Sequence, residues 1–241
     1  MAKKQLKIVF SSRKDGDANQ EFIKHVQTTC GYPAHIYHIH NPTGVALTKI
    51  YNDMLNSNHD ESELNDDSDI VIFIHDDIEF LKKGWGAEIV RLFKENKNYG
   101  IIGVAGSAQF DEDGAWWNYK KKYGQVLHRS EGKSWLTAFS PLLDKDLQEV
   151  CVIDGLFMAI NKNRVTQPFD EEIDGFDFYE IDACLANYLD GKCKIGVTTN
   201  IRLAHNSVGA LKDGWYKNRE KVINKYKKYF PIDVDKKNDR R

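Results

Sequence analysis

A histidine and two adjacent aspartates follow an apolar run in the stretch IVIFIHDDIEF, residues 70–80. The β-branched and aromatic run 70–74 is typical of a strand that is buried on both faces. His75, Asp76 and Asp77 then stand where that strand leaves the sheet. Burying two unpaired carboxylates is costly, so these acids need water, hydrogen-bond donors or a cation. A turn or helix cap is the structural alternative, because aspartate favours such positions.

Two later groups could share a site with these acids. Glu180 and Asp182 fall in the first turn of a helix predicted within FYEIDACLANYLDG, and His205 follows a short predicted strand. Carboxylates at a helix start also suit the helix dipole, a contribution of about 0.3–1 kcal/mol that needs no function. A lone histidine is commonly structural. Together, however, such groups could hold a divalent cation and accept a proton.

The elements that would position these residues follow an α/β pattern. Strands predicted at 6–10, 34–40, 70–74 and 99–105 alternate with helices at 17–30, 47–55 and 85–93. Asp17 is the expected cap of the first helix. This alternation predicts a mostly parallel central sheet with helices on both faces. Ligands bind such sheets beyond the carboxyl ends of the strands.

The second half of the chain is less regular. Residues 106–150 lack periodicity and are rich in Gly, Lys and aromatics, which predicts an irregular insertion that is functional or mobile. Strand-like runs return at 151–160, 193–198 and 201–204. We expect one domain over 1–210 and a basic aromatic helix with a tail over 211–241. The acidic run 56–69 reads as an exposed loop.

Composition narrows the function classes. The chain has 241 residues, 41% hydrophobic and 29% charged, enough for one large α/β domain. Its 34 basic and 36 acidic residues nearly cancel, which argues against a general nucleic-acid binder. Four scattered cysteines indicate reduced core thiols. No signal peptide or long apolar span is evident, so we expect a cytoplasmic protein and leave open peripheral association with the inner face of a membrane.

Three patches of sequence resemble a known enzyme class. They are TKIYNDML, VIFIHDDIEF, and VIDGLFMAINKNRV continuing through FYEIDACLANYLDGKCKIGV to LAHNS. Their order resembles the GT-A glycosyltransferases, especially the bacterial family 2-like group that includes a streptomycin-biosynthesis protein. The resemblance covers most of residues 6–210. It implies an α/β GT-A (nucleotide-diphospho-sugar transferase) fold and transfer of a sugar from a nucleotide-diphosphate donor.

The resemblance also implies a metal site. In that family a D-x-D motif after a central strand binds a divalent cation and the donor diphosphate. Asp77 matches its last position, Asp76 would support the site, and His75 replaces the first acid. His205 matches a histidine that completes the metal shell in many GT-A enzymes. Mn²⁺ or Mg²⁺ is the expected cofactor, with Mn²⁺ favoured because it tolerates imidazole better.

The same resemblance places the catalytic base in the late acidic motif. Tyr179 replaces the first acid of that motif, so the role passes to Glu180, our preference, or to Asp182. Direct attack by the acceptor hydroxyl would invert the anomeric centre. The remaining predicted contacts to the nucleotide-sugar are Ser11, Ser12, Arg13, Asn52, Asp76, Asp154 and Gly155. For Gly155 the structural alternative is close backbone approach.

The expected function is an inverting, metal-assisted, hexosyltransferase-type glycosyltransferase. A UDP-sugar is the expected donor, and the acceptor hydroxyl would belong to a saccharide, a lipid-linked compound or a small molecule, in bacterial polysaccharide, glycolipid or metabolite synthesis. Two alternatives stay open. One is a Mg²⁺-dependent nucleotidyl- or phosphoryl-transferase that uses the same acids. The other is a nucleotide-sugar-binding module without turnover, which the replacements at His75 and Tyr179 would suit.

Overall fold

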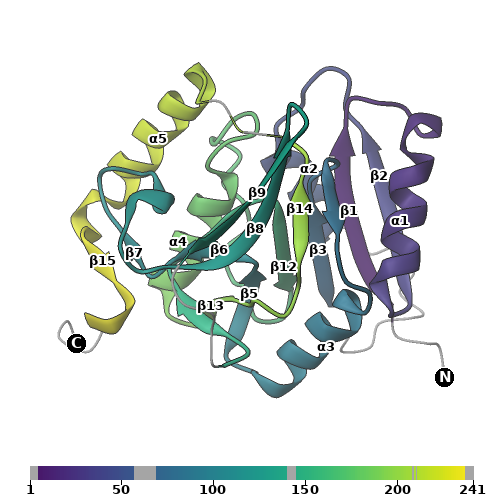
Figure 1. Ribbon diagram of the computed structural model, residues 1–241. Coiled ribbons are helices and arrows are strands. Elements are labelled where there is room, and N and C mark those ends of the chain that lie inside the picture. Colours follow the sequence, from purple (N-terminus) through teal and green to yellow (C-terminus); the bar gives the residue numbers. More distant parts are fainter. Residues whose placement is uncertain (1–4, 57–68, 140–144, 208, 210, 237–241) are drawn as a thin grey trace.

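A computed structural model describes residues 5–56, 69–139, 145–207, 209 and 211–236. Most of the predicted acidic loop and the last five residues of the tail therefore lie outside the described residues. Figure 1 shows a central sheet with helices packed around it and a long hairpin in front of it. Within the described residues, no helix has the length and apolar character that crossing a bilayer requires.

The central sheet is mixed, with a parallel majority. Its order is β10-β13-β5-β12-β3-β1-β2. The strands are β1 Leu6–Ser12, β2 Ala34–His40, β3 Ile70–Ile74, β5 Tyr99–Gly103, β10 Gln148–Val150, β12 Phe157–Asn161 and β13 Lys194–Val197. β1, β2 and β3 are parallel, and β12 runs antiparallel to both β3 and β5, while β13 runs parallel to β5. The predicted mostly parallel α/β sheet is confirmed.

Helices cover both faces of this sheet. They are α1 Gln20–Cys30, α2 Leu47–Asn56, α3 Trp85–Glu95 and α4 Tyr179–Asp190. Tyr51 of α2 stacks on Phe73 with ring centroids 4.0 Å apart. The ring centroids of Trp85 in α3 and Phe157 in β12 are 6.0 Å apart, and Phe157 lies directly opposite Ile74 of β3. Because neighbouring residues of a strand face opposite sides, α2 and α3 lie on opposite faces.

The first helix begins differently from its prediction. Asp17 opens a short 3-10 turn, Asp17–Asn19, and α1 starts only at Gln20. The side chain that caps this turn is Asp15, whose Oδ1 accepts a hydrogen bond from the backbone N–H of Ala18 at 3.1 Å. Asp17 is therefore not the cap. Both aspartates fit the preference for acids at helix starts, and sequence alone does not separate them.

The segment 106–150 is more regular than predicted. A second sheet contains β4 Ile78–Phe80, β6 Ala105–Ser107, β8 Lys122–Ser130, β9 Lys133–Phe139, β11 Val152–Ile153 and β14 Leu203–His205. Its order is β11-β6-β8-β14-β4, with β9 on the other side of β8. β9 is largely exposed on both faces, so its residues are under no pressure to alternate between apolar and polar. That absence of alternation hid the hairpin.

The C-terminal segment is a helix, as predicted, and it packs on the domain. α5 spans Asp213–Tyr226, followed by a 3-10 turn and by β15 Ile232–Asp233, which pairs with β7 Gln109–Phe110. Trp215 of α5 lies 5.2 Å from the ring of Phe178, the residue that precedes α4. The helix thus supports the start of α4. The four cysteines are buried free thiols.

The contact between α1 and α3 allows a test of this packing. A Cβ at Gly86 would lie 2.3 Å from Cys30 Sγ. Alanine usually favours a helix over glycine by about 1 kcal/mol, but overpacking costs about 1–3 kcal/mol. We therefore expect Gly86→Ala to lower the free energy of unfolding in urea titrations. Gly16→Ala is the control, since a Cβ there meets nothing within 4 Å; equal stability of the two variants would contradict the packing.

Candidate functional site

Three potential metal ligands converge at the end of β3. His75 and Asp77 follow β3, and His205 ends β14, where it pairs with Ile78 of β4. One ligand atom from each of the three residues lies within 4.8 Å of the others. His205 Nε2 is 3.3 Å from Asp77 Oδ1, and His75 Nδ1 is 4.0 Å from the same oxygen. The structure thus brings the predicted residues Asp77 and His205 together and adds His75.

The adjacent aspartate has a different partner. Ser12 Oγ, at the end of β1, donates a hydrogen bond of 2.6 Å to Asp76 Oδ2. A pocket of about 320 Å³ opens beside this pair. Its lining consists of Ser11, Ser12, Arg13, Lys14, Asn41, Leu47, Tyr51, Ile74, His75, Asp76, Asp77 and Phe176. Four residues predicted to contact a nucleotide-sugar therefore share one pocket with two of the three potential ligands.

The tautomer of His75 follows from its hydrogen bonds. The Tyr179 hydroxyl lies 3.0 Å from the carbonyl oxygen of Gly155 and 3.2 Å from His75 Nε2. A carbonyl can only accept, so the tyrosine proton goes to Gly155. The hydroxyl oxygen then accepts from His75 Nε2–H. His75 Nδ1 is left with its lone pair toward Asp77, as a metal ligand requires.

Gly155 allows this arrangement by having no side chain. A Cβ at Gly155 would lie 2.3 Å from the Tyr179 hydroxyl oxygen and 3.2 Å from the Glu180 carboxyl carbon. A side chain at this position would therefore collide with the tyrosine hydroxyl and crowd the glutamate carboxylate. Close backbone approach, the structural alternative raised from the sequence, is the geometry observed. Next to it, Asp154 Oδ1 accepts a 3.0 Å hydrogen bond from the backbone N–H of Leu156.

Glu180 is a carboxylate held in an environment that favours its neutral form. It stands in the first turn of α4, and its Oε2 is shielded from solvent with no hydrogen-bond partner within the described chain. Burial raises the pKa of Glu180 to about 8, with a further contribution from the negative charges of Asp154 and Asp177. A carboxyl group with such a pKa can exchange a proton near neutral pH.

Asp77 shows the opposite behaviour. Burial acts to raise its pKa, but contacts with His205 and Ser207 and the nearby His75 outweigh burial and hold the pKa well below its usual value. Burial acts to lower the pKa of His205, and Asp77 reverses this and raises it. Asp77 is therefore an anion at neutral pH, which suits a cation ligand.

The loop before α4 is fixed from two sides. Phe178 has φ of 68°, the left-handed region that non-glycine residues seldom adopt. The buried Asn218 of α5 donates to the carbonyl oxygens of Asp174 and Asp177 at 2.5 and 2.9 Å. Thr48 of α2 donates to the carbonyl oxygen of Ile173 at 3.0 Å. These contacts hold the strained residue that directs Tyr179 and Glu180 toward Gly155.

Two predicted site residues lie elsewhere and are corrections. Asp182 is 1% exposed and pairs with Lys225 of α5 at 2.8 Å. Because residues two apart on a helix point about 200° apart, Asp182 and Glu180 cannot face the same site. Asn52 is also buried, and its amide donates to the Phe169 carbonyl at 2.8 Å and accepts from the Phe169 N–H at 2.9 Å. Its amide is used in joining α2 to a loop.

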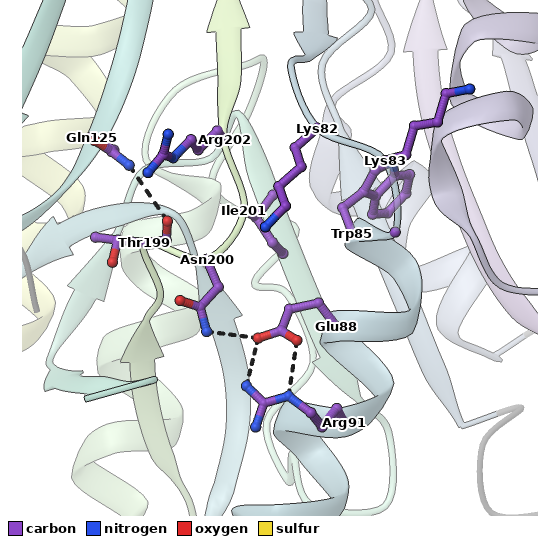
Figure 2. Close-up of a pocket in the computed structure, with 11 residues that line it drawn as sticks. Lys82, Lys83, Trp85, Glu88, Arg91, Gln125, Thr199, Asn200, Ile201 and Arg202 are labelled. Carbon is purple, nitrogen blue, oxygen red and sulfur yellow. Dashed lines mark hydrogen bonds and ion pairs between the residues drawn. The ribbon is translucent and has the colours of Figure 1, made fainter. Parts of the chain in front are cut away.

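A separate pocket of about 440 Å³ lies beside α3 and contains none of the predicted residues (Figure 2). Lys82, Lys83 and Arg202 contribute cationic side chains to its lining. At its base, Glu88 accepts hydrogen bonds from Arg91 at 2.7 Å and from Asn200 at 2.7 Å. It shares no lining residue with the pocket beside Asp76.

Sequence reasoning missed the contributions of His75, Tyr179 and Ser207. Asp76 and Asp77 form a turn, so the alternation of side chains along β3 does not extend to Asp77 and does not predict its approach to His75. Tyr179 and His75 are 104 positions apart in sequence, so their hydrogen bond required the fold. Ser207 Oγ lies 3.2 Å from His205 Nε2, a contact that two-residue spacing in a loop does not predict.

A family profile described as "Glycosyltransferase like family" matches residues 9–226. The match spans most of the chain, including all three potential ligands and Glu180. The chain belongs to this glycosyltransferase-like family. No curated protein matches the sequence at a significant level.

One solved structure supports the fold assignment. A crystal structure described as GalNAc-T7 with UDP, GalNAc and Mn²⁺ superposes with a TM-score of 0.52 at 12% identity, covering 95% of this chain and 50% of that chain. This chain thus spans half the length of that relative. Two matches are looser. A197 from STIV has a TM-score of 0.44 and 9% identity, covering 85% of this chain and 86% of that chain. The inositol-1-phosphate CTP transferase from T. maritima has a TM-score of 0.37 and 13% identity, covering 91% of this chain and 77% of that chain. The GT-A fold expected from the sequence is confirmed.

The raised pKa of Glu180 predicts a stability change with pH. Between its ordinary pKa of 4.5 and the folded value of about 8, the folded protein keeps a proton that the unfolded chain releases. Stability conferred by the protonated group is therefore lost as pH rises through this window. In urea titrations we expect the free energy of unfolding of wild type to fall between pH 5 and pH 8 relative to that of Glu180→Gln, which has no carboxyl group to titrate. The fall should be on the order of 1 kcal/mol, because partial exposure of the residue reduces the full effect.

Glu220→Gln, a change at an exposed glutamate of α5, is the control for this titration and should follow the wild-type pH profile. Parallel profiles for wild type and Glu180→Gln would show that Glu180 is not held in its neutral form.

Proposed function

We propose that the protein is an inverting glycosyltransferase that moves a sugar from a nucleotide-diphosphate donor to an acceptor hydroxyl with the help of a divalent cation. The observation that carries the proposal is the convergence of His75, Asp77 and His205 beside the pocket that contains Ser12 and Asp76. Family membership supports the transferase class. The GalNAc-T7 structure, which holds UDP, GalNAc and Mn²⁺, supports a UDP-sugar as donor.

The three residues fit a divalent metal ion. Asp77 Oδ1 is shielded from solvent and, despite lying near His205, has no well-aligned hydrogen bond within the described chain. A shielded carboxylate oxygen without a hydrogen-bond donor is stabilised by a cation. Two imidazoles and one carboxylate suit Mn²⁺ better than Mg²⁺. When bound, the ion would neutralise negative charge that develops on the diphosphate leaving group.

Residues at the end of β1 would hold the donor. Ser11, Ser12 and Arg13 line the pocket together with Asp76. The Arg13 guanidinium is exposed at the pocket wall and can pair with phosphate oxygens. The hydrogen bond from Ser12 to Asp76 holds both side chains at this pocket. Asp76 is not part of the ligand cluster, which consists of His75, Asp77 and His205. Asp154 and Gly155 would border the sugar.

Glu180 would act as the base. The acceptor oxygen attacks the anomeric carbon and forms the new glycosidic bond, while the bond to the diphosphate breaks and its electron pair stays on the diphosphate. The proton of the acceptor hydroxyl passes to Glu180. A pKa near 8 makes the carboxylate a stronger base than an exposed glutamate. One displacement of this kind inverts the anomeric centre.

The replacements at the two family motifs are compatible with turnover. His75 and Tyr179 each occupy the position of an acid, and these two residues hydrogen-bond to each other at 3.2 Å. The pair supplies a ligand nitrogen and its support, so the two changes form one functional unit. This contact weakens the reason for considering a binding module without turnover.

A donor panel tests the proposed activity. With UDP-, GDP- and dTDP-sugars and Mn²⁺, we expect nucleotide release from at least one donor. Glu180→Gln should lower kcat by about 10²–10⁴ because a positioned base contributes that much, while UDP binding measured by calorimetry persists. Asp77→Asn should weaken Mn²⁺-dependent UDP binding itself. Release from no donor, together with absence of UDP binding, would refute the proposal.

Removing one hydroxyl tests the support of His75. Tyr179→Phe keeps the ring but deletes the acceptor for His75 Nε2–H, so the imidazole is free to change tautomer. We expect Mn²⁺ affinity, measured by electron paramagnetic resonance of the free ion, to fall about 10- to 100-fold, the range for lost support of a metal ligand. Tyr216→Phe, at an exposed tyrosine, is the control. Unchanged affinity in Tyr179→Phe would mean that the Tyr179 hydroxyl does not support His75 as a ligand.

A further inference from the structure

A row of rings runs across the second sheet away from the ligand cluster. His205 of β14 pairs with His128 of β8, and His128 pairs with Trp135 of β9. Residues paired directly across neighbouring strands project from the same face of a sheet. The ring centroids confirm the row, with His205 and His128 6.0 Å apart and His128 and Trp135 5.5 Å apart at an interplanar angle of 20°.

Trp135 presents an open aromatic surface at the end of this row. It is 41% exposed although one side stacks on His128. Lys133 and Thr137 are two positions away on β9, so they project from the same face and flank the indole with an amine and a hydroxyl. Leu136, 60% exposed, projects from the opposite face. The face of Trp135 therefore combines a flat apolar surface with neighbouring hydrogen-bonding groups.

The distance from the ligand cluster suits a second sugar ring. Trp135 is two strands away from His205, a separation of roughly 9–10 Å. A donor sugar attached to a diphosphate at the cluster would occupy the nearer part of this space. The next ring along, that of the acceptor, would then lie on the open face of Trp135. Aromatic faces pack against the apolar C–H face of a pyranose, and flanking polar groups bind its hydroxyls.

We propose that the β8–β9 hairpin forms the acceptor subsite and that the acceptor is a saccharide whose pyranose ring stacks on Trp135. This inference rests on the proposed glycosyltransferase function and names the acceptor class for the same site. The location favours a saccharide over a membrane surface, because one aromatic face is aligned with the ligand cluster. Insertion into a bilayer would use the apolar side chains on both faces of the hairpin.

Binding of sugars without turnover tests the subsite directly. Saturation-transfer NMR with methyl glycosides of glucose, galactose, mannose and N-acetylglucosamine should detect binding of at least one sugar to wild type in the presence of UDP and Mn²⁺. We expect Trp135→Ala to lower the affinity roughly tenfold, equivalent to one aromatic stacking contact. Trp135→Phe should recover part of it. Leu136→Ala, on the opposite face, should bind as wild type.

The kinetic counterpart separates this inference from the proposed function. Trp135→Ala should raise KM for the acceptor saccharide, whereas Leu136→Ala, on the opposite face, should leave both this KM and hydrolysis of the nucleotide-sugar unchanged. No binding of any glycoside to wild type, or equal loss in Trp135→Ala and Leu136→Ala, would overturn the subsite even if UDP and Mn²⁺ bind. The protein could instead bind anionic phosphatidylglycerol vesicles, with both variants weakening this binding equally. That result would identify the hairpin as a membrane contact and would also overturn the subsite. Failure of UDP and Mn²⁺ to bind would count against the proposed function itself.

Discussion

One tyrosine hydroxyl connects the three parts of the chain that form the site. Tyr179 at the start of α4 donates its proton to the Gly155 carbonyl and accepts from His75 at the end of β3. The hydroxyl is fully buried, so both of its bonds must be satisfied within the protein. This requirement fixes the imidazole tautomer, sets the approach of α4 to Gly155, and thereby places the Glu180 carboxylate beside Gly155. The strained Phe178 and the contacts from α5 serve the same constraint.

The fold explains why a histidine can stand at position 75, where the resemblance to the GT-A enzymes implies an acid. The turn that follows β3 directs His75 and Asp77 toward His205 and Asp76 toward Ser12. Exchanging an acid for an imidazole at the first position keeps this direction and replaces an oxygen ligand by nitrogen. The exchange needs a new partner for the second ring nitrogen, and Tyr179 supplies it. Two departures that look independent in sequence are therefore physically linked.

Sequence reasoning located the strand ends well and the helix and hairpin contributions less well. An apolar run that stops at polar residues marks the end of a buried strand clearly. The carboxyl ends of the parallel strands β1 and β3 lie side by side, so Ser12, Asp76 and Asp77 lie close together as expected. Asp182 was misplaced because two acids in one helical turn look equivalent in sequence although they project in different directions. Asn52 was misplaced because an amide that bonds a distant loop gives no local signal. The β8–β9 hairpin stayed hidden because both of its faces meet solvent along β9.

Two carboxylates, Glu180 beside Gly155 and Asp77 beside His205, differ in electrostatic environment, and this difference matches the roles proposed for them. Asp77 faces imidazoles that keep it charged, whereas Glu180 faces a shielded, negatively charged surrounding that favours its proton. A cation ligand must be anionic before the cation arrives, and a base must gain a proton readily during attack. Environments that separate the pKa values of two acids in this way are typical of paired roles in catalysis. Under the proposed function, exchanging the two environments would leave a neutral group at the metal site and a weak base for the acceptor hydroxyl.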